Sequence, residues 1–141
     1  VKLARDRLTT DPVLVMNGDT WLGTDLCLFL DSHRKSGAMV SVLCVPVDDV
    51  CRYGSVELNH GRITAFREKD PANSGPGLIS AGAYFISQAA LGSVAGPSLE
   101  RDFLQRLPPE SIHGYVPDAI NFIDIGTPES LIAASAILTG E

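Results

Sequence analysis

An α/β sandwich around a mixed β-sheet, with an inserted β-hairpin, is the fold class that the sequence predicts. Three observations predict it: continuous apolar runs of strand length, helical periodicity between those runs, and alternating apolar and polar residues in the middle of the chain. Strand and helix patterns alternate at first and strand patterns then cluster, as in layers packed on one sheet. The length of 141 residues predicts a single domain, or part of one, over 1–141.

The N-terminal part predicts a short helical segment and then a buried strand. Leu3 and Leu8 are spaced to share one helix face, and Pro12 breaks that segment. Residues 13–17 are apolar except for the last, so both faces of this strand must be covered, as in a sheet between helices. The next residues, Asn17–Thr20, predict a loop at the carboxyl end of the strand.

A helix and a second buried strand follow this loop. Thr24 or Asp25 caps the helix, in which apolar residues recur at helical spacing. The helix runs to about Lys35, and Gly37 ends it. Residues 38–46 are apolar and close on a proline, which predicts the second strand.

The middle of the chain predicts a β-hairpin. Apolar and polar residues alternate over 54–58 and again over 62–67, and Gly61 lies in the turn between them. Pro71–Gly77 predicts a loop because it is rich in proline, glycine, asparagine and serine. Residues 78–86 then predict another strand, interrupted by a glycine.

The C-terminal third predicts two short strands between two helices. Ser98 caps a helix expected to reach about Leu107. Short strands are predicted at 112–116 and 121–124. A Thr-Pro-Glu start, with threonine as cap and proline at the first helical position, predicts a closing helix over 128–138.

Composition excludes some classes of protein. The net charge of −6 and the scattered basic residues argue against nucleic-acid binding, which needs basic patches. No apolar stretch approaches the roughly 18 residues of a membrane helix, and the N-terminus lacks a secretory signal. Cys27, Cys44 and Cys51 lack metal-ligand spacing and are expected to be reduced core residues. The cytoplasm is therefore the expected location.

Two aspartates stand at comparable places. Asp19 follows a buried strand and a glycine, and Asp124 ends a short strand just before a helix. Ligands of open α/β sheets bind outside the carboxyl ends of strands. One or two carboxylates together with substrate phosphates are the usual ligands of Mg²⁺. Each aspartate taken singly is also a common turn former beside glycine.

A series of short motifs follows in a characteristic order over about residues 11–138. The motifs are V-L-V-M-N-G-D-T, Y-G-S-V-E-L, F-R-E-K, I-S-A-G-A-Y, S-L-E-R-D-F and F-I-D-I-G-T-P-E. This order resembles the sugar-1-phosphate nucleotidylyltransferases, closest to the mannose-1-phosphate and heptose-1-phosphate guanylyltransferase type. The resemblance implies a three-layer α/β sandwich with a Rossmann-like mixed sheet of the nucleotide-diphospho-sugar transferase type. It also implies transfer of a nucleoside monophosphate from a nucleoside triphosphate to a sugar 1-phosphate, with release of pyrophosphate.

The resemblance also implies roles for individual residues. Asp19 and Asp124 would hold a catalytic Mg²⁺, and Lys69 would meet the sugar phosphate. The positions carried over to substrate binding are Tyr53, Gly54, Glu68, Lys69, Ser80 and Gly82. For the Tyr-Gly pair a simple turn before a strand stays open as the alternative. For the Glu-Lys pair a solvated surface pair stays open.

Two departures from the family pattern matter. The family commonly has asparagine where this chain has Ser80, so sugar contacts there are in doubt. The family also opens with a strand and a glycine-rich, arginine-containing loop that cradles the triphosphate, and no such loop occurs within the sequence. The expectation is therefore an N-terminally truncated domain that holds the sugar-phosphate-binding half.

These departures leave three functions open: part of an enzyme, a non-catalytic sugar-phosphate-binding or regulatory module, and a fragment without a role of its own. The sugar and the base are not determined by the sequence. The chain alone is expected to lack transferase activity. Its first strand is expected to have an open edge, and such an edge favours self-association or pairing with the missing half.

Overall fold

The computed structural model describes residues 1–139, and the side chains of residues 1–135. The strands are β1 (Val13–Met16), β2 (Thr20–Gly23), β3 (Val40–Val47), β4 (Ser55–Asn59), β5 (Arg62–Arg67), β6 (Gly77–Ile86), β7 (Ile112–Tyr115) and β8 (Asn121–Asp124). The helices are α1 (Leu26–Ser36), α2 (Gln88–Leu91), α3 (Leu99–Asp102) and α4 (Pro128–Thr139), with 3-10 helices η1 (Lys2–Arg7), η2 (Leu104–Arg106) and η3 (Pro109–Ser111).

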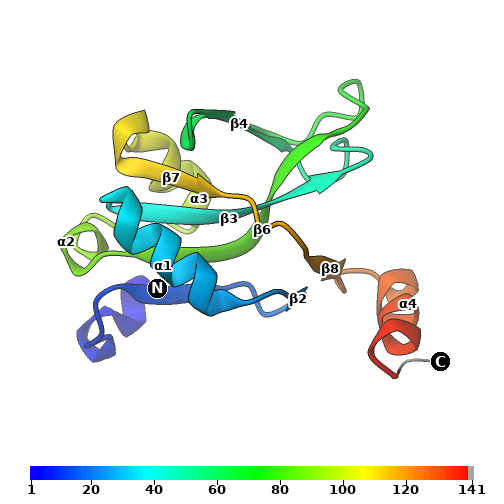
Figure 1. Ribbon diagram of the computed structural model, residues 1–141, viewed down its shortest axis with the longest axis horizontal. Coiled ribbons are helices and arrows are strands. Elements are labelled where there is room, and N and C mark those ends of the chain that lie inside the picture. The colour runs from blue at the N-terminus through cyan, green and yellow to red at the C-terminus, as the bar shows by residue number, and fades with distance from the viewer. Residues whose placement is uncertain (140–141) are drawn as a thin grey trace.

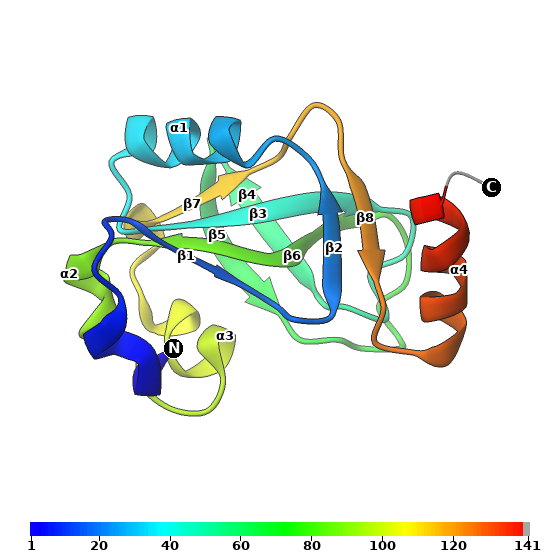
Figure 2. The same cartoon turned by 90° about the horizontal axis from the view of Figure 1, so that it is seen from below.

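The elements form three layers, as predicted. The middle layer is a sheet in the order β1-β6-β3-β7-β5-β4. Strands β3 and β7 pair in parallel and the other pairs are antiparallel, so the sheet is mixed. Helix α1 covers one face, and α2, α3 and the 3-10 helices lie on the other (Figures 1 and 2). The inserted hairpin β4–β5 forms one edge of the sheet and β1 the other.

Each face of the sheet has its own core. On the α1 face, Phe29 packs with Leu43 of β3 and Phe85 of β6, and its ring is 4.8 Å from that of Phe85. On the opposite face, the second cluster includes Leu91, Phe103 and two valines of β3, Val40 and Val42. The continuous apolar run of β3 is thus explained, because β3 is buried on both sides.

Local signals determine the ends of α1. The side chain of Asp25 accepts a hydrogen bond from the Cys27 amide at 2.8 Å, so Asp25 and not Thr24 is the cap. Gly37 ends the helix in the left-handed conformation, with φ of 63°. Both ends follow from the sequence pattern.

Strand β2 is not among the predicted strands, because the sequence pattern assigns Thr20 to a loop and gives no element to residues 21–23. Within residues 1–139 it pairs only with β8, about a hundred residues later in the chain, in a two-stranded ribbon. The ribbon crosses the end of the main sheet between α1 and α4 (Figure 2). Its pairing is long-range, so no local pattern indicates it.

The predicted helix from Ser98 to about Leu107 is wrong in its extent. Helix α3 stops at Asp102, Phe103 leaves the helical conformation, and η2 follows. The break allows Phe103 and Leu104 both to reach the core. The first segment, η1, is a 3-10 helix in which Leu3 is fully exposed, so the shared face predicted for Leu3 and Leu8 does not form.

The cysteines are all free thiols, but they are not all core residues. Cys44 is buried, Cys51 is half-buried and Cys27 is exposed on the first turn of α1. The expectation of a core position is therefore wrong for Cys27, because its neighbours are apolar in sequence but its helix face points to solvent. In the described part of the chain, no helix is long and apolar enough to cross a membrane.

Candidate functional site

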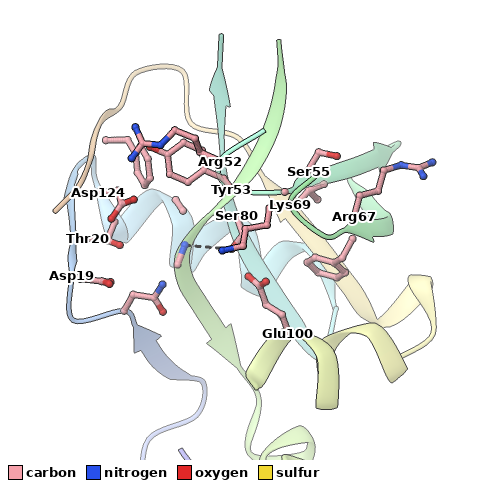
Figure 3. A pocket seen from close by; sticks show the side chains of 17 residues that line it. Asp19, Thr20, Arg52, Tyr53, Ser55, Arg67, Lys69, Ser80, Glu100 and Asp124 are labelled. Atoms are coloured by element: carbon pink, nitrogen blue, oxygen red, sulfur yellow. Dashed lines mark hydrogen bonds between the residues drawn. The ribbon is translucent and has the colours of Figure 1, made fainter. Parts of the chain in front are cut away.

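A cavity of about 310 Å³ opens between the ribbon, the β4–β5 hairpin, β6 and α3 (Figure 3). This volume lies at the lower end of the range for small-molecule sites. The polar and charged residues that line it are Asn17, Asp19, Thr20, Arg52, Tyr53, Ser55, Arg67, Lys69, Ser80, Glu100 and Asp124. Most of the residues expected to bind substrate are therefore brought together here, along with Gly54 and Gly82.

The ribbon brings the two predicted carboxylates to this cavity. In the β2–β8 register, Thr20 is opposite Asp124, and the Ile125 amide donates to the Asp19 carbonyl at 2.9 Å. Asp124 is half-buried and Asp19 is exposed. One oxygen of Asp124, Oδ1, accepts a hydrogen bond from the Gly126 amide at 2.9 Å. The Asp124–Gly126 bond is the turn contact expected of an aspartate near glycine, and strand pairing also places both aspartates at one end of the sheet.

The Tyr53-Gly54 turn forms one wall of the cavity. The Val50 carbonyl accepts hydrogen bonds from the amides of both residues, each at 3.0 Å. Gly54 has φ of 81°, and a Cβ there would clash with the carbonyl oxygen of Arg67. A glycine is required at this position both by its conformation and by the close approach of β5.

Asp49 holds this turn against the loop before β6. Its Oδ1 accepts hydrogen bonds from the Cys51 amide at 3.0 Å and the Gly75 amide at 3.2 Å. Its Oδ2 accepts from the Cys51 thiol at 3.2 Å. These hydrogen bonds, first of all that from the Cys51 amide, lower the pKa of Asp49. The same thiol–carboxylate bond raises the pKa of Cys51.

Two of the three cations that line the cavity come from the end of the hairpin, and the third, Arg52, comes from the turn before β4. Arg67 and Lys69 line the cavity, whereas Glu68 between them does not. Nε of Arg67 is 2.6 Å from Oε1 of Glu57, so this guanidinium already has a carboxylate partner. In residues 1–139 Lys69 has no ion pair, and its charge is available to a ligand.

Ser80 and Gly82 lie on the irregular part of β6. The register of β6 with β3 shifts between Val42 and Cys44, and Gly82 has φ of 71°. A Cβ at Gly82 would meet the side chain of Asn17, which fills the space beside it. Gly82 is therefore required by its conformation and by Asn17, in addition to its place on the cavity wall.

Sequence reasoning missed several residues of the cavity. The guanidinium carbon of Arg52 lies 5.6 Å from the centre of the Tyr53 ring, and that ring meets Phe122 edge-on at 6.0 Å. Glu100 lines the cavity from α3. Its place inside S-L-E-R-D-F was the available signal, but a charged first turn also suits a helix dipole. Ser55 of β4 also lines the cavity.

Comparisons with known proteins agree with this geometry. The profile of the family described as nucleotidyl transferase matches residues 1–141. The mannose-1-phosphate guanylyltransferase of Mycobacterium tuberculosis is 35% identical over 94% of this chain and 38% of its own length. The D-glycero-alpha-D-manno-heptose 1-phosphate guanylyltransferase of Aneurinibacillus thermoaerophilus is 31% identical over 92% of this chain and 56% of its own.

The crystal structure of HddC from Yersinia pseudotuberculosis superposes with a TM-score of 0.83 and 31% identity, over 97% of this chain and 60% of that one. The same protein complexed with GMP-PN superposes with a TM-score of 0.82. The chain thus spans between about two fifths and three fifths of the length of these relatives. The match over the whole chain, the fold and the order of site residues together show that this chain belongs to the nucleotidyl transferase family, among the sugar-1-phosphate nucleotidylyltransferases.

Proposed function

We propose that the full-length protein containing this chain transfers GMP from GTP to a sugar 1-phosphate and releases pyrophosphate. One observation carries the proposal: paired strands present Asp19 and Asp124 to the same cavity that holds Lys69. The named relatives are guanylyltransferases of mannose 1-phosphate and of a heptose 1-phosphate, which supports the choice of base and substrate class.

Mg²⁺ is the cofactor of this proposal, with Asp19 and Asp124 as its protein ligands. Carboxylate oxygens are the donors that Mg²⁺ prefers, and Asp124 keeps one oxygen, Oδ2, outside its bond to Gly126. The described residues contain no cluster of three or more His, Cys, Asp or Glu that could hold a metal. A site of two carboxylates completed by substrate oxygens fits this donor set. When bound, the ion would neutralise charge on the reacting phosphates.

The chain's own residues would position the acceptor. Lys69 attracts the phosphate of the sugar 1-phosphate, whose oxygen attacks the α-phosphorus of GTP while the bond to pyrophosphate breaks. The Tyr53-Gly54 turn supports the sugar from the hairpin side, and Ser80 and Gly82 form the floor. Glu68 does not line the cavity, so it is a weaker candidate for substrate binding than the resemblance implied.

The test uses the full-length protein with GTP and mannose 1-phosphate, followed by pyrophosphate release. We expect release only when both substrates and Mg²⁺ are present, and less with ATP, CTP or UTP. A heptose 1-phosphate serves as the second acceptor. Binding of sugar 1-phosphate without turnover with any nucleoside triphosphate would instead identify a binding module and overturn the enzymatic proposal.

We expect residues 1–141 alone to be inactive. Phosphoryl transfer depends on gripping and orienting the triphosphate, and these residues include no glycine-rich, arginine-containing loop after a strand. The same pyrophosphate assay on the 141-residue chain tests this. Release above background that depends on both substrates would contradict it.

We also propose that the 141-residue chain self-associates or pairs with further polypeptide along β1. In the described residues β1 pairs only with β6, and Leu14 and Met16 are exposed on it. Sedimentation at micromolar concentration is the measurement, and a folded monomer would refute this. The cytoplasm is the proposed location, where the nucleoside triphosphate is available; fractionation of the source cells tests it.

A further inference from the structure

We propose that Ser80 and Tyr84 position the carboxylate of Glu100 to accept hydrogen bonds from hydroxyl groups of the sugar ring. Ser80 then acts through Tyr84 and does not itself donate to the substrate. The inference rests on the proposed function and deepens it, because it assigns the part of the cavity that recognises the sugar. Three hydrogen bonds, the burial of Tyr84 and the anchoring of α3 carry it.

Glu100 is presented to the cavity by a short but firmly held helix. The Ser98 hydroxyl accepts from the Arg101 amide at 3.2 Å, and the Ser98 amide donates to Oδ2 of Asp102 at 2.8 Å. The next two residues, Phe103 and Leu104, are buried in the core. In Figure 3, Glu100 rises from α3 toward Ser80, whereas Asp19 and Asp124 come from the ribbon.

Tyr84 fixes one oxygen of this carboxylate. Its side chain belongs to the core, the residue is only 3% exposed, and its hydroxyl donates to Oε1 of Glu100 at 2.9 Å. Burial, with the nearby Glu100 charge, raises the pKa of Tyr84, so the phenol keeps its proton and stays a donor. A hydrogen bond to a charged group from a buried donor is among the stronger kinds.

The position of Tyr84's single proton determines the role of Ser80. Because that proton goes to Glu100, Ser80 must be the donor in its 3.0 Å hydrogen bond with the Tyr84 hydroxyl. The Ser80 oxygen in turn accepts from the Gly82 amide at 3.3 Å. Ser80 therefore has no proton left for a ligand, and its hydroxyl is directed along the chain Ser80–Tyr84–Glu100.

The remaining oxygen of Glu100 is the group suited to the sugar. Within residues 1–139, Oε2 has no hydrogen-bond partner, and Glu100 lines the cavity. A carboxylate accepts hydrogen bonds from neighbouring hydroxyls of a polyol and repels a phosphate. Glu100 and Lys69 would thus orient the substrate in opposite senses, hydroxyls toward the carboxylate and phosphate toward the ammonium.

The experiment compares Tyr84→Phe, Ser80→Ala, their double variant and Glu100→Gln in the full-length protein. KM for the sugar 1-phosphate, KM for GTP and kcat are measured, with the Kd of the sugar 1-phosphate from calorimetry. We expect Tyr84→Phe and Glu100→Gln to raise the sugar-phosphate KM and Kd about tenfold and Ser80→Ala about threefold. KM for GTP should change less than about twofold.

The double variant distinguishes a Ser80 that acts through Tyr84 from a Ser80 that contacts the sugar directly. If Ser80 acts through Tyr84, removing its hydroxyl has no further effect once Tyr84 is phenylalanine. An undiminished effect of Ser80→Ala in that background, or unchanged sugar-phosphate KM and Kd in Tyr84→Phe, would overturn the proposal. Ser41→Ala and Tyr115→Phe are matched hydroxyl deletions away from the cavity and should leave both constants unchanged.

The failure of this inference differs from the failure of the proposed function. If the wild-type protein binds sugar 1-phosphate without transferring GMP, the enzymatic proposal is wrong, but the Kd values of the variants still test the hydrogen-bond chain Ser80–Tyr84–Glu100. A wild-type protein that binds no sugar 1-phosphate removes both. If wild-type turnover is normal and the substitutions leave the sugar-phosphate KM and Kd unchanged, only the proposed role of this hydrogen-bond chain is wrong.

Discussion

The two sides of the cavity are built differently. On the ribbon side, Asp124 ends β8 and Asp19 directly precedes β2. In the described part of the chain these two strands pair only with each other, and every residue of β2 is half-buried. The opposite side belongs to β6 and α3, where Tyr84 is buried and its hydroxyl bonds to both Ser80 and Glu100. The ribbon joins the α1-face core through Leu22 and Phe122, which are only partly buried.

Under the proposed function, the ribbon side would bind the reacting groups and the β6 side would recognise the sugar. On the β6 side, polar groups are already held by hydrogen bonds before a ligand arrives, which lowers the entropic cost of binding. On the ribbon side, the Asp19 carboxylate is exposed and, in the described part of the chain, has no hydrogen-bond partner. We therefore expect substitutions on the ribbon to change turnover and substitutions in the main sheet to change stability.

The largest effect is expected from the ribbon carboxylates. Asp19→Asn or Asp124→Asn in the full-length protein should lower kcat by about a thousandfold or more, because each removes charge at the proposed metal site. The free energy of unfolding should change by less than about 0.5 kcal/mol for the exposed Asp19. Pyrophosphate release and urea unfolding measure the two effects.

Asp31→Asn is the matched control for these variants, since Asp31 is an exposed carboxylate on α1 outside the cavity. It should keep wild-type turnover. Substitutions at Asp19 and Asp124 that reduce activity only in proportion to lost folded protein would show that the ribbon is structural and break the comparison.

Gly54→Ala should give a large loss of stability. The left-handed conformation and the clash with the Arg67 carbonyl act together, and we expect about 3 kcal/mol of destabilisation. Gly37→Ala shares the positive φ but meets no atom within 4 Å, so about 1 kcal/mol is expected. Equal losses in the two variants would mean that β5 moves aside and that this wall is not rigid.

A smaller effect is expected from pH, through His33 of α1 and His113 of β7. Burial lowers the pKa of His33, which pairs with Ser41, and of His113, whose Nδ1 donates to the Gly61 carbonyl at 2.7 Å. Protonation of these histidines is therefore less favourable in the folded state, so the unfolded chain binds more protons as pH falls through about 6.5. Stability is full above that pH and is lost as pH falls, by about 1.4 kcal/mol for each unit of pKa difference.

Unfolding by urea at pH 7.5 and 5.5 measures this effect. His33→Asn or His113→Asn should be less stable at pH 7.5 and show a shallower fall toward pH 5.5. His60→Asn, in the exposed hairpin turn where φ is 47°, is the control, because asparagine tolerates that conformation. A wild-type protein that is equally stable at both pH values would contradict the lowered pKa of His33 and His113.

The smallest effect is expected on α4, beyond the ribbon. Ile132 is 74% exposed, so Ile132→Ala should change the free energy of unfolding by less than about 0.5 kcal/mol. Leu43→Ala in β3, where the side chain is fully buried, should cost about 2–5 kcal/mol. A large loss of stability from Ile132→Ala in the full-length protein would show that further polypeptide packs on α4. This face of the helix would then not be a solvent-exposed surface.

Local chemistry in the sequence determined much of the fold. The Asp25 cap, the Gly37 end and the doubly buried run of β3 are short-range or compositional features, so their elements were predicted within a few residues. The resemblance implied only a substrate-binding role for Gly54, and the structure shows a separate requirement for glycine there in the carbonyl of Arg67. The motif order was enough to indicate the family and the two aspartates.

Tertiary structure alone decided the rest, because the contacts involved are distant in sequence. Strand β2 exists only through its pairing with β8, and that pairing brings Asp19 beside Asp124. Glu68 and Lys69 are neighbours in the sequence, yet only the lysine lines the cavity. The direction of the Ser80 hydroxyl depends on Tyr84 and Glu100. The Tyr84 hydroxyl has one proton and donates it to Glu100, so Ser80 must donate to Tyr84. Only the packing of α3 against β6 brings these three residues together.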